Sequence, residues 1–127
     1  MKPLLAVLAL AVVATAIPAQ AHFKEPVPLG WDEWANRQWS VGGNRCCDPT
    51  DVWLFSGEWR YEFETGGTAI VGVTLVFDGG REIYVPKSRF VDRTLNDGDD
   101  INPTGNAVVW YKDIENIYCF DPPGPLA

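Results

Sequence analysis

Histidine and basic side chains are scarce in this sequence of 127 residues. His22 is the single histidine, and ten Lys and Arg stand against 17 Asp and Glu, which gives a net charge of −7. Nucleic acids and anionic membrane surfaces require a basic footprint, so we expect neither as a partner. The sequence also lacks an HExxH motif, a phosphate-binding loop and a nucleophile elbow. These absences favour a non-enzymatic protein.

Long apolar runs are missing too, except for one near the start. Residues 4–17 carry no charge and follow Lys2, and the small residues Ala19 and Ala21 stand at the −3 and −1 positions of a cleavage site. A membrane-spanning helix needs about 20 apolar residues, and this run is shorter. We therefore expect residues 1–21 to be a signal peptide that is removed. The protein would then be exported to the periplasm or the extracellular space, with no membrane span after cleavage.

The remaining chain, residues 22–127, has the length of one domain. It holds nine basic residues against 17 acidic ones, a net charge of −8. This charge is compatible with a cation ligand, with a basic protein partner, or with solubility alone. We expect a single small β-rich domain.

Only three cysteines occur, and two of them, Cys46 and Cys47, are adjacent. Exported proteins form disulfides, but neighbouring Cα atoms lie about 3.8 Å apart, below the usual disulfide range. The expected bond therefore joins Cys119 to Cys47 or to Cys46. It would close a loop of about 73 residues and stabilise the fold by about 4 kcal/mol on the chain-entropy model. We interpret the remaining thiol as a buried apolar cysteine, with an intermolecular disulfide or a reactive thiol as alternatives.

Apolar spacing and turn residues predict one helix followed by six strands. The Pro-rich residues 22–30 predict an extended arm. Apolar residues at three- and four-residue steps predict a helix over 31–41, which Gly42-Gly43 would end. Period-two alternation and the hairpin signal Asp78-Gly79-Gly80 predict strands. The predicted strands are 51–55, 58–64, 69–77, 82–85, 107–112 and 116–120.

The predicted fold is mainly β. Six short antiparallel strands in meander order, within residues 51–120, would form a barrel-like or curled sheet packed on the helix. The disulfide would tie the helix-to-sheet junction to the last strand. Residues 121–127 are Pro-rich and would form an extended tail.

A metal site is conceivable at the new amino terminus. After cleavage His22 carries the α-amino group, and this amine together with Nδ1 can chelate copper. Lytic polysaccharide monooxygenases complete such a site with a second histidine, which this chain lacks. Asp, Glu or Cys would have to supply the third ligand. The alternative is a polar residue that happens to follow a cleavage site.

The loop of residues 97–106 is dense in oxygen ligands, among them Asp97, Asp99 and Asp100. Counted from Asp100, ligand types fall at positions one, three and five with glycine at six, as at the start of a calcium loop. Position twelve, however, is Tyr111 rather than glutamate. A calcium site is one hypothesis, and a solvated turn is the other.

Six tryptophans suggest a surface on which sugar rings could stack. Carboxylates such as Glu62 and Glu64 could then bind hydroxyl groups or perform acid–base chemistry. The alternative is that the aromatic side chains form the core of a small protein. The tryptophans singled out for a ligand surface are Trp31, Trp34, Trp59 and Trp110.

Three segments carry a resemblance to a known group of proteins. Residues 46–51 read Cys-Cys-Asp-Pro-Thr-Asp, 80–86 read Gly-Arg-Glu-Ile-Tyr-Val-Pro, and 117–124 read Ile-Tyr-Cys-Phe-Asp-Pro-Pro-Gly. The chain resembles small secreted bacterial and phage-associated proteins with a Cys-Cys-x-x-x-Asp-Cys motif, a Gly-x-x-x-x-Val-Pro strand and a C-terminal Cys-Phe-x-Pro. Val52 stands where their third cysteine would be. The resemblance implies no activity.

These observations favour an exported, disulfide-stapled domain that binds a glycan or a protein of the envelope without catalysis. A copper-binding protein that uses His22 is one alternative. A glycan-binding or glycan-active protein with an aromatic surface is the other. Clustered, solvent-exposed tryptophans would favour the glycan hypothesis.

Overall fold

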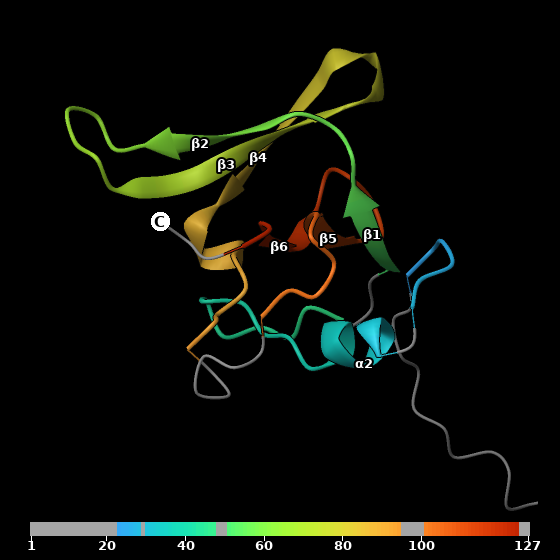
Figure 1. The fold of residues 1–127 in the computed structure, drawn as a ribbon. Coiled ribbons are helices and arrows are strands. Elements are labelled where there is room, and N and C mark those ends of the chain that lie inside the picture. Colours follow the sequence, from blue (N-terminus) through green and yellow to red (C-terminus); the bar gives the residue numbers. More distant parts are fainter. Residues whose placement is uncertain (1–22, 29, 48–50, 95–100, 125–127) are drawn as a thin grey trace, which may run out of the picture.

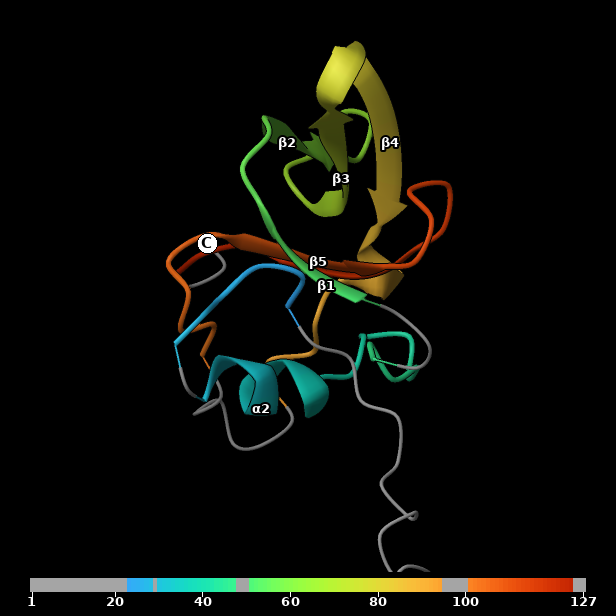
Figure 2. The ribbon, with the colours of Figure 1, turned by 90° about the vertical axis from the view of Figure 1, so that its right-hand side faces the viewer.

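The chain folds into three layers, which Figure 2 shows one above another: a three-stranded sheet at the top, a second three-stranded sheet seen edge-on in the middle, and a helix with its flanking coil below. The computed structural model describes residues 23–28, 30–47, 51–94 and 101–124. Its elements, labelled in Figure 1, are α2 (Trp31–Asn36), β1 (Asp51–Phe55), β2 (Trp59–Phe63), β3 (Ile70–Phe77), β4 (Arg81–Pro86), β5 (Ala107–Tyr111), β6 (Ile117–Asp121) and two short 3-10 helices, η2 (Asp78–Gly80) and η3 (Lys87–Arg89).

The middle layer is the sheet β1-β5-β6 (Figure 2), and its two faces contribute to two different core clusters. On β5, Val108 and Trp110 belong to the core beside α2, whereas Ala107 and Val109 belong to the core shared with the other sheet. A strand that is buried on both faces needs apolar residues at every position, which is why β5 reads as an apolar run instead of an alternation.

The outer layer is the sheet β2-β3-β4, a meander in which each strand pairs with its neighbour in sequence. Trp59 and Tyr61 of β2 face the core between the sheets, whereas Phe63, at the next alternate position, is exposed. Gly79 and Gly80 have φ of 82° and 80° in the β3–β4 connection, a backbone conformation that glycine adopts without strain. The hairpin signal at residues 78–80 is thus confirmed.

The prediction of a single barrel-like or curled sheet is wrong, because the strands form two separate sheets. Strand β1 pairs with β5 rather than with β2. The segment after β1 carries the chain from one layer to the other, and it packs so closely at Gly57 that a Cβ there would lie 2.8 Å from the Phe55 ring. Turn residues report a change of direction but not which strand becomes the partner.

The helix is shorter than predicted, since α2 ends at Asn36 rather than at residue 41. The Gln38 side chain donates to the Trp34 carbonyl, and Trp39 then forms an antiparallel bridge with Arg45. Gly43, with φ of 87°, turns this hairpin instead of ending the helix. Across the described ranges, no helix has the length and apolar character needed to cross a membrane.

The extended arm is fixed to the edge of the middle sheet. Phe23 forms a parallel bridge with Val52 of β1, and the Lys24 N–H donates to the Val52 carbonyl over 3.0 Å. The Phe23 side chain is buried in the core beside α2. At the other end of the chain, β6 extends through Asp121, the first residue of the predicted tail.

One disulfide joins Cys46 to Cys119, with Cα atoms 5.4 Å apart and a sequence separation of 73. The expected bond to Cys119 is therefore confirmed. Of the two pairings that the sequence leaves open, the one through Cys47 is excluded, because Cys47 is a free, buried thiol. The bond ties the segment after α2 to β6.

Candidate ligand-binding pocket

A hairpin of residues 38–46, directly after α2, forms the first wall of a pocket. The Ser40 N–H donates to the Asn44 carbonyl over 2.8 Å, and the Cys46 N–H donates to the Gln38 carbonyl over 3.1 Å. Trp39 and Arg45 face each other across this hairpin in a bridge pair. The pairing places an indole and a guanidinium group on adjacent strands.

Residues 88–92 lie between this hairpin and β6 and hydrogen-bond to both. The Val41 N–H donates to the Phe90 carbonyl, and the Asp92 N–H donates to the Trp39 carbonyl, each over 2.8 Å. On the other side, the Val91 N–H donates to the Phe120 carbonyl over 2.9 Å. Segments distant in sequence therefore form one continuous hydrogen-bonded surface.

A β-bulge in β6 supplies the second aromatic ring. Trp110 pairs with Cys119 and Tyr111 pairs with Ile117, so Tyr118 is an extra residue between two paired positions. Bulges of this kind redirect a side chain and often occur beside functional sites. Tyr118 accordingly lines the pocket.

The pocket has a volume of about 410 Å³, within the range of about 300–1,000 Å³ that is usual for small-ligand sites. Trp39 is 41% exposed, so much of its indole is open to solvent. The lining combines two aromatic rings, two guanidinium groups and two carboxamides. Its residues are Trp39, Gly43, Asn44, Arg45, Arg89, Asn116 and Tyr118.

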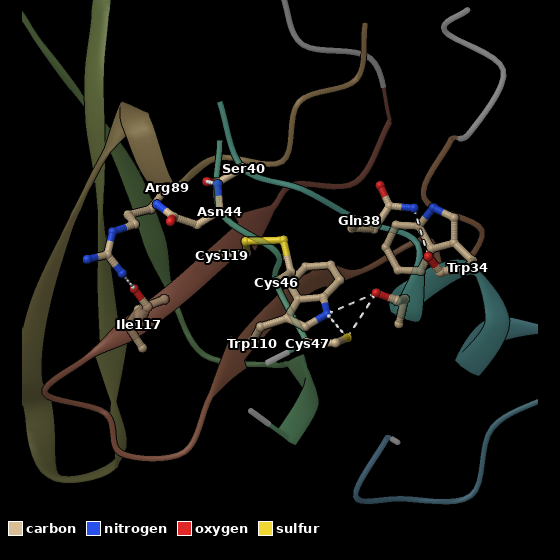
Figure 3. The surroundings of a disulfide bond; sticks show 11 residues. Trp34, Gln38, Ser40, Asn44, Cys46, Cys47, Arg89, Trp110, Ile117 and Cys119 are labelled. Carbon is tan, nitrogen blue, oxygen red and sulfur yellow. Dashed lines mark hydrogen bonds between the residues drawn. A yellow bond between two sulfur atoms is a disulfide. The ribbon is translucent and has the colours of Figure 1, made fainter. Parts of the chain in front are cut away.

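Arg89 is held in place by two contacts with β6. Its Nη1 donates to the Ile117 carbonyl over 2.8 Å, as Figure 3 shows. Its guanidinium carbon lies 5.9 Å from the centroid of the Tyr118 ring, a cation–π distance. A guanidinium carries five N–H donors, so a ligand can bind Arg89 beside the Ile117 contact.

The four tryptophans singled out from the sequence do not form a common surface. Trp34 and Trp110 are 3% and 0% exposed, with ring centroids 5.6 Å apart in the core beside α2. Trp31 and Trp59 are partly buried against different core clusters. The exposed indole in the pocket belongs to Trp39. The other lining residues were missed because they lie in three segments with no shared motif.

Cys47 directly follows the disulfide-bonded Cys46 in sequence, and its own thiol is free and buried. Its thiol donates to the Ala35 carbonyl over 3.1 Å and accepts from Trp110 Nε1 over 3.2 Å (Figure 3). Burial raises the pKa of this thiol from 9.0 to about 11. Cys47 lies in the core beside α2, so the interpretation of the remaining thiol as a buried cysteine is confirmed. The raised pKa disfavours the thiolate, which is the reactive form of cysteine.

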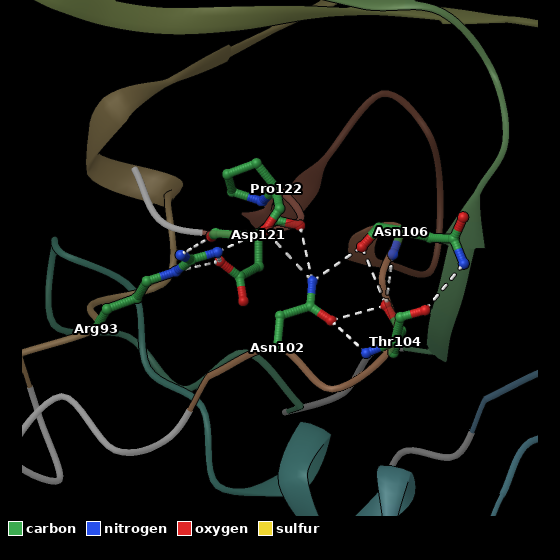
Figure 4. A network of polar contacts seen from close by, with 7 residues as sticks. Arg93, Asn102, Thr104, Asn106, Asp121 and Pro122 are labelled. Atoms are coloured by element: carbon green, nitrogen blue, oxygen red, sulfur yellow. Dashed lines mark hydrogen bonds and ion pairs between the residues drawn. The ribbon is translucent and has the colours of Figure 1, made fainter. Parts of the chain in front are cut away.

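A second polar cluster, shown in Figure 4, is structural. Asn102 Oδ1 accepts from the backbone and hydroxyl of Thr104 over 2.8 and 2.7 Å, and Nδ2 donates to the Asn106 carbonyl over 2.9 Å. Arg93 donates to Asp121 Oδ1 through Nε and Nη2 over 2.9 and 2.7 Å. Arg93 and Asn102 thereby connect their loops to the end of β6, since Asn102 Nδ2 also donates to the Asp121 and Pro122 carbonyls.

The proposed metal ligands lie outside the described residues. These are His22 for copper, and Asp97, Asp99 and Asp100 for calcium. In the described part of the candidate calcium loop, residues 101–106, Asn102 and Thr104 are buried and bond to the loop itself. Within the described ranges, no group of three or more His, Cys, Asp or Glu side chains is arranged to hold a metal ion.

Comparisons with family models, with curated proteins and with solved structures found no match for this chain. The resemblance to small secreted proteins with paired cysteines therefore stays a prediction. A functional assignment has to come from the pocket, where Trp39, Tyr118, two arginines and two asparagines converge on one small disulfide-containing β domain.

Proposed function

We propose that the protein is an exported, non-enzymatic binding domain that holds a saccharide in the Trp39 pocket. The observation that carries this proposal is the exposed indole of Trp39 within a pocket whose other lining groups are almost all polar donors. A saccharide presents apolar ring faces and many hydroxyl groups, so it needs both kinds of contact.

The lining residues supply both kinds of contact. The exposed Trp39 ring offers a flat face against which a sugar ring can pack, and the partly buried Tyr118, with Arg89 over its ring, borders the same pocket. Asn44 and Asn116 each bring a carboxamide, which donates and accepts hydrogen bonds and so suits hydroxyl groups. Both asparagines are exposed at the pocket.

Binding without catalysis fits the lining chemistry. Hydrolysis of a glycosidic bond commonly uses two carboxyl groups, one on each side of the bond. Among the described residues that line the pocket, none is Asp, Glu, His or Cys. The lining therefore offers a ligand recognition groups but no acid–base pair.

Two features support export. Residues 1–21 have the charge, the apolar run and the small residues of a cleavable signal peptide. The Cys46–Cys119 disulfide is the kind of bond that persists in oxidising compartments and is rare in the cytosol. The ligand would then be a glycan of the envelope or of the surroundings.

A saccharide binding screen with Trp39→Ala tests the proposal. The purified wild-type protein is screened against neutral and acidic oligosaccharides, and affinities are measured by calorimetry. Truncating an aromatic anchor in a binding site costs about tenfold or more in affinity, so we expect a loss of that size for Trp39→Ala.

Tyr84→Ala is the matched control, because Tyr84 is an aromatic residue that is 52% exposed on the outer sheet, outside the pocket lining. It should bind as the wild type does. The proposal fails if no saccharide binds the wild type. It also fails if Trp39→Ala and Tyr84→Ala, both folded by circular dichroism, bind equally well.

A further inference from the structure

The pocket is positively charged in an acidic protein. The whole chain has a net charge of −7, yet Arg45 and Arg89 both line the pocket. None of the described lining residues is acidic. The local charge therefore opposes the charge of the molecule, which indicates a preference for an anion at this one place.

Three other arginines pair with carboxylates among the described residues. Arg60 pairs with Glu82, Arg81 with Glu115, and Arg93 with Asp121. By contrast, neither Arg45 nor Arg89 forms an ion pair with any described residue. Glu115 lies next to the lining residue Asn116, but its carboxylate is engaged by Arg81.

The arrangement of the two groups suits one ligand. Arg45 projects from the hairpin of residues 38–46, and Arg89 from η3, so they approach the pocket from different segments. Arg89 is fixed by Ile117 and Tyr118 and is thereby preorganised. The planar guanidinium group matches the two oxygens of a carboxylate. The exposed Trp39 ring next to these groups suits a sugar ring.

We propose that the ligand of the Trp39 pocket is an acidic saccharide whose carboxylate is bound by Arg45 and Arg89. This inference rests on the proposed function, because it names the class of saccharide that the same pocket selects. Trp39 holds the ring, and the two asparagines bond to its hydroxyl groups. Selectivity for the acidic form resides in the arginines.

Paired ligands isolate the carboxylate. Oligosaccharides of galacturonate, mannuronate and glucuronate are each compared with their methyl esters, which keep the sugars and linkages but remove the charge. We expect the wild type to bind the acid of at least one pair ten times more tightly than its ester. This preference should shrink as salt is raised, because salt screens exposed charges.

Arg45→Gln and Arg60→Gln form a matched pair of variants, since each removes one positive charge from an exposed side chain. Arg45 lines the pocket, whereas Arg60 lies on β2 and pairs with Glu82. We expect Arg45→Gln to lose most of the preference for the acid, at least fivefold. Arg60→Gln should retain it. Arg89→Lys keeps the positive charge but loses the planar guanidinium group with its paired N–H donors. This variant should bind the acid more weakly than the wild type.

The outcomes separate this inference from the function on which it rests. If every acid and its ester bind equally, or only neutral sugars bind, and Trp39→Ala weakens that binding, the pocket binds saccharides but the role of the arginines is disproved. If Arg45→Gln and Arg60→Gln lose the same preference, a diffuse charge effect explains it and the inference fails. If no saccharide binds, the proposed function itself fails.

Discussion

At the scale of single residues, Cys46 and Cys47 show how neighbours in the chain acquire different chemistry. Cys46 is bonded to Cys119, while Cys47 hydrogen-bonds with Ala35 and Trp110 in the core beside α2. Sequence analysis limits the disulfide to these two candidates. It cannot choose between them, because the choice depends on which sulfur faces β6 in the folded chain.

The raised pKa of Cys47 predicts a loss of stability at alkaline pH. In the unfolded chain the thiol releases its proton near pH 9.0, whereas the folded protein retains it up to about pH 11. Between these values the unfolded state binds fewer protons, so the free energy of unfolding falls as pH rises. The contribution is complete below pH 9 and is reduced by about 2–3 kcal/mol at pH 11. Urea unfolding from pH 7 to pH 11 measures it.

Cys47→Ser is the control for this titration, since serine does not ionise in the range and keeps a donor for Ala35. Burial also raises the pKa of Tyr61 and Tyr111. Both proteins share these tyrosines, so their effect cancels in the difference. The difference in unfolding free energy between wild type and Cys47→Ser should be constant below pH 9 and fall above it. A constant difference up to pH 11 would contradict the prediction.

At the scale of secondary structure, local patterns predict the strands well and their partners poorly. The predicted segments 58–64 and 69–77 match β2 and β3 to within a residue at each end. The pairing of β1 with β5 links segments separated by more than 50 positions. Alternation and turn residues carry no information about so distant a partner. The predicted helix, 31–41, is too long because a hairpin of residues 38–46 begins directly after α2.

The candidate site was less predictable than the fold. Trp39, Arg89 and Tyr118 meet only because residues 88–92 hydrogen-bond to both the hairpin and β6. Tyr118 reaches the pocket through a bulge, and the spacing of apolar residues in β6 does not reveal which residue is the extra one. The number of tryptophans suggests an aromatic binding surface, but it does not show which of them is exposed in a pocket.

Gly57 has little room for a side chain, because it lies where the chain crosses between the sheets. A Cβ there would collide with the Val76 backbone oxygen and lie 2.8 Å from the Phe55 ring. The backbone oxygen cannot move without disturbing β3. We expect Gly57→Ala to lower the free energy of unfolding by about 1–3 kcal/mol, as overpacking does. Urea denaturation measures the change.

Ser56→Ala is the neighbouring control, since Ser56 is exposed in the same connection. Exposed substitutions of this kind usually change stability by less than about 0.5 kcal/mol. If Gly57→Ala were as stable as Ser56→Ala, the close approach between the β1–β2 connection and β3 would be disproved.

At the scale of the whole molecule, the disulfide connects global stability to the pocket. Cys46 follows Arg45 and Cys119 follows Tyr118, so the bond joins the two chain segments that carry these lining residues. A bond across 73 positions stabilises by about 4 kcal/mol on the chain-entropy model. That is a large share of the 5–15 kcal/mol typical of a domain. Loss of the bond should therefore affect both folding and binding.

We predict that the free energy of unfolding of the double variant Cys46→Ala/Cys119→Ala is about 4 kcal/mol lower than that of the wild type. It should also lose pocket affinity by more than its lower stability explains, because the hairpin of residues 38–46 is no longer covalently fixed to β6. Binding is measured at low temperature, where circular dichroism shows a folded protein. Gly57→Ala provides the comparison, since it destabilises the chain without altering the pocket lining. Equal affinity of the folded double variant and the wild type would show that hydrogen bonds through residues 88–92 suffice to hold the pocket.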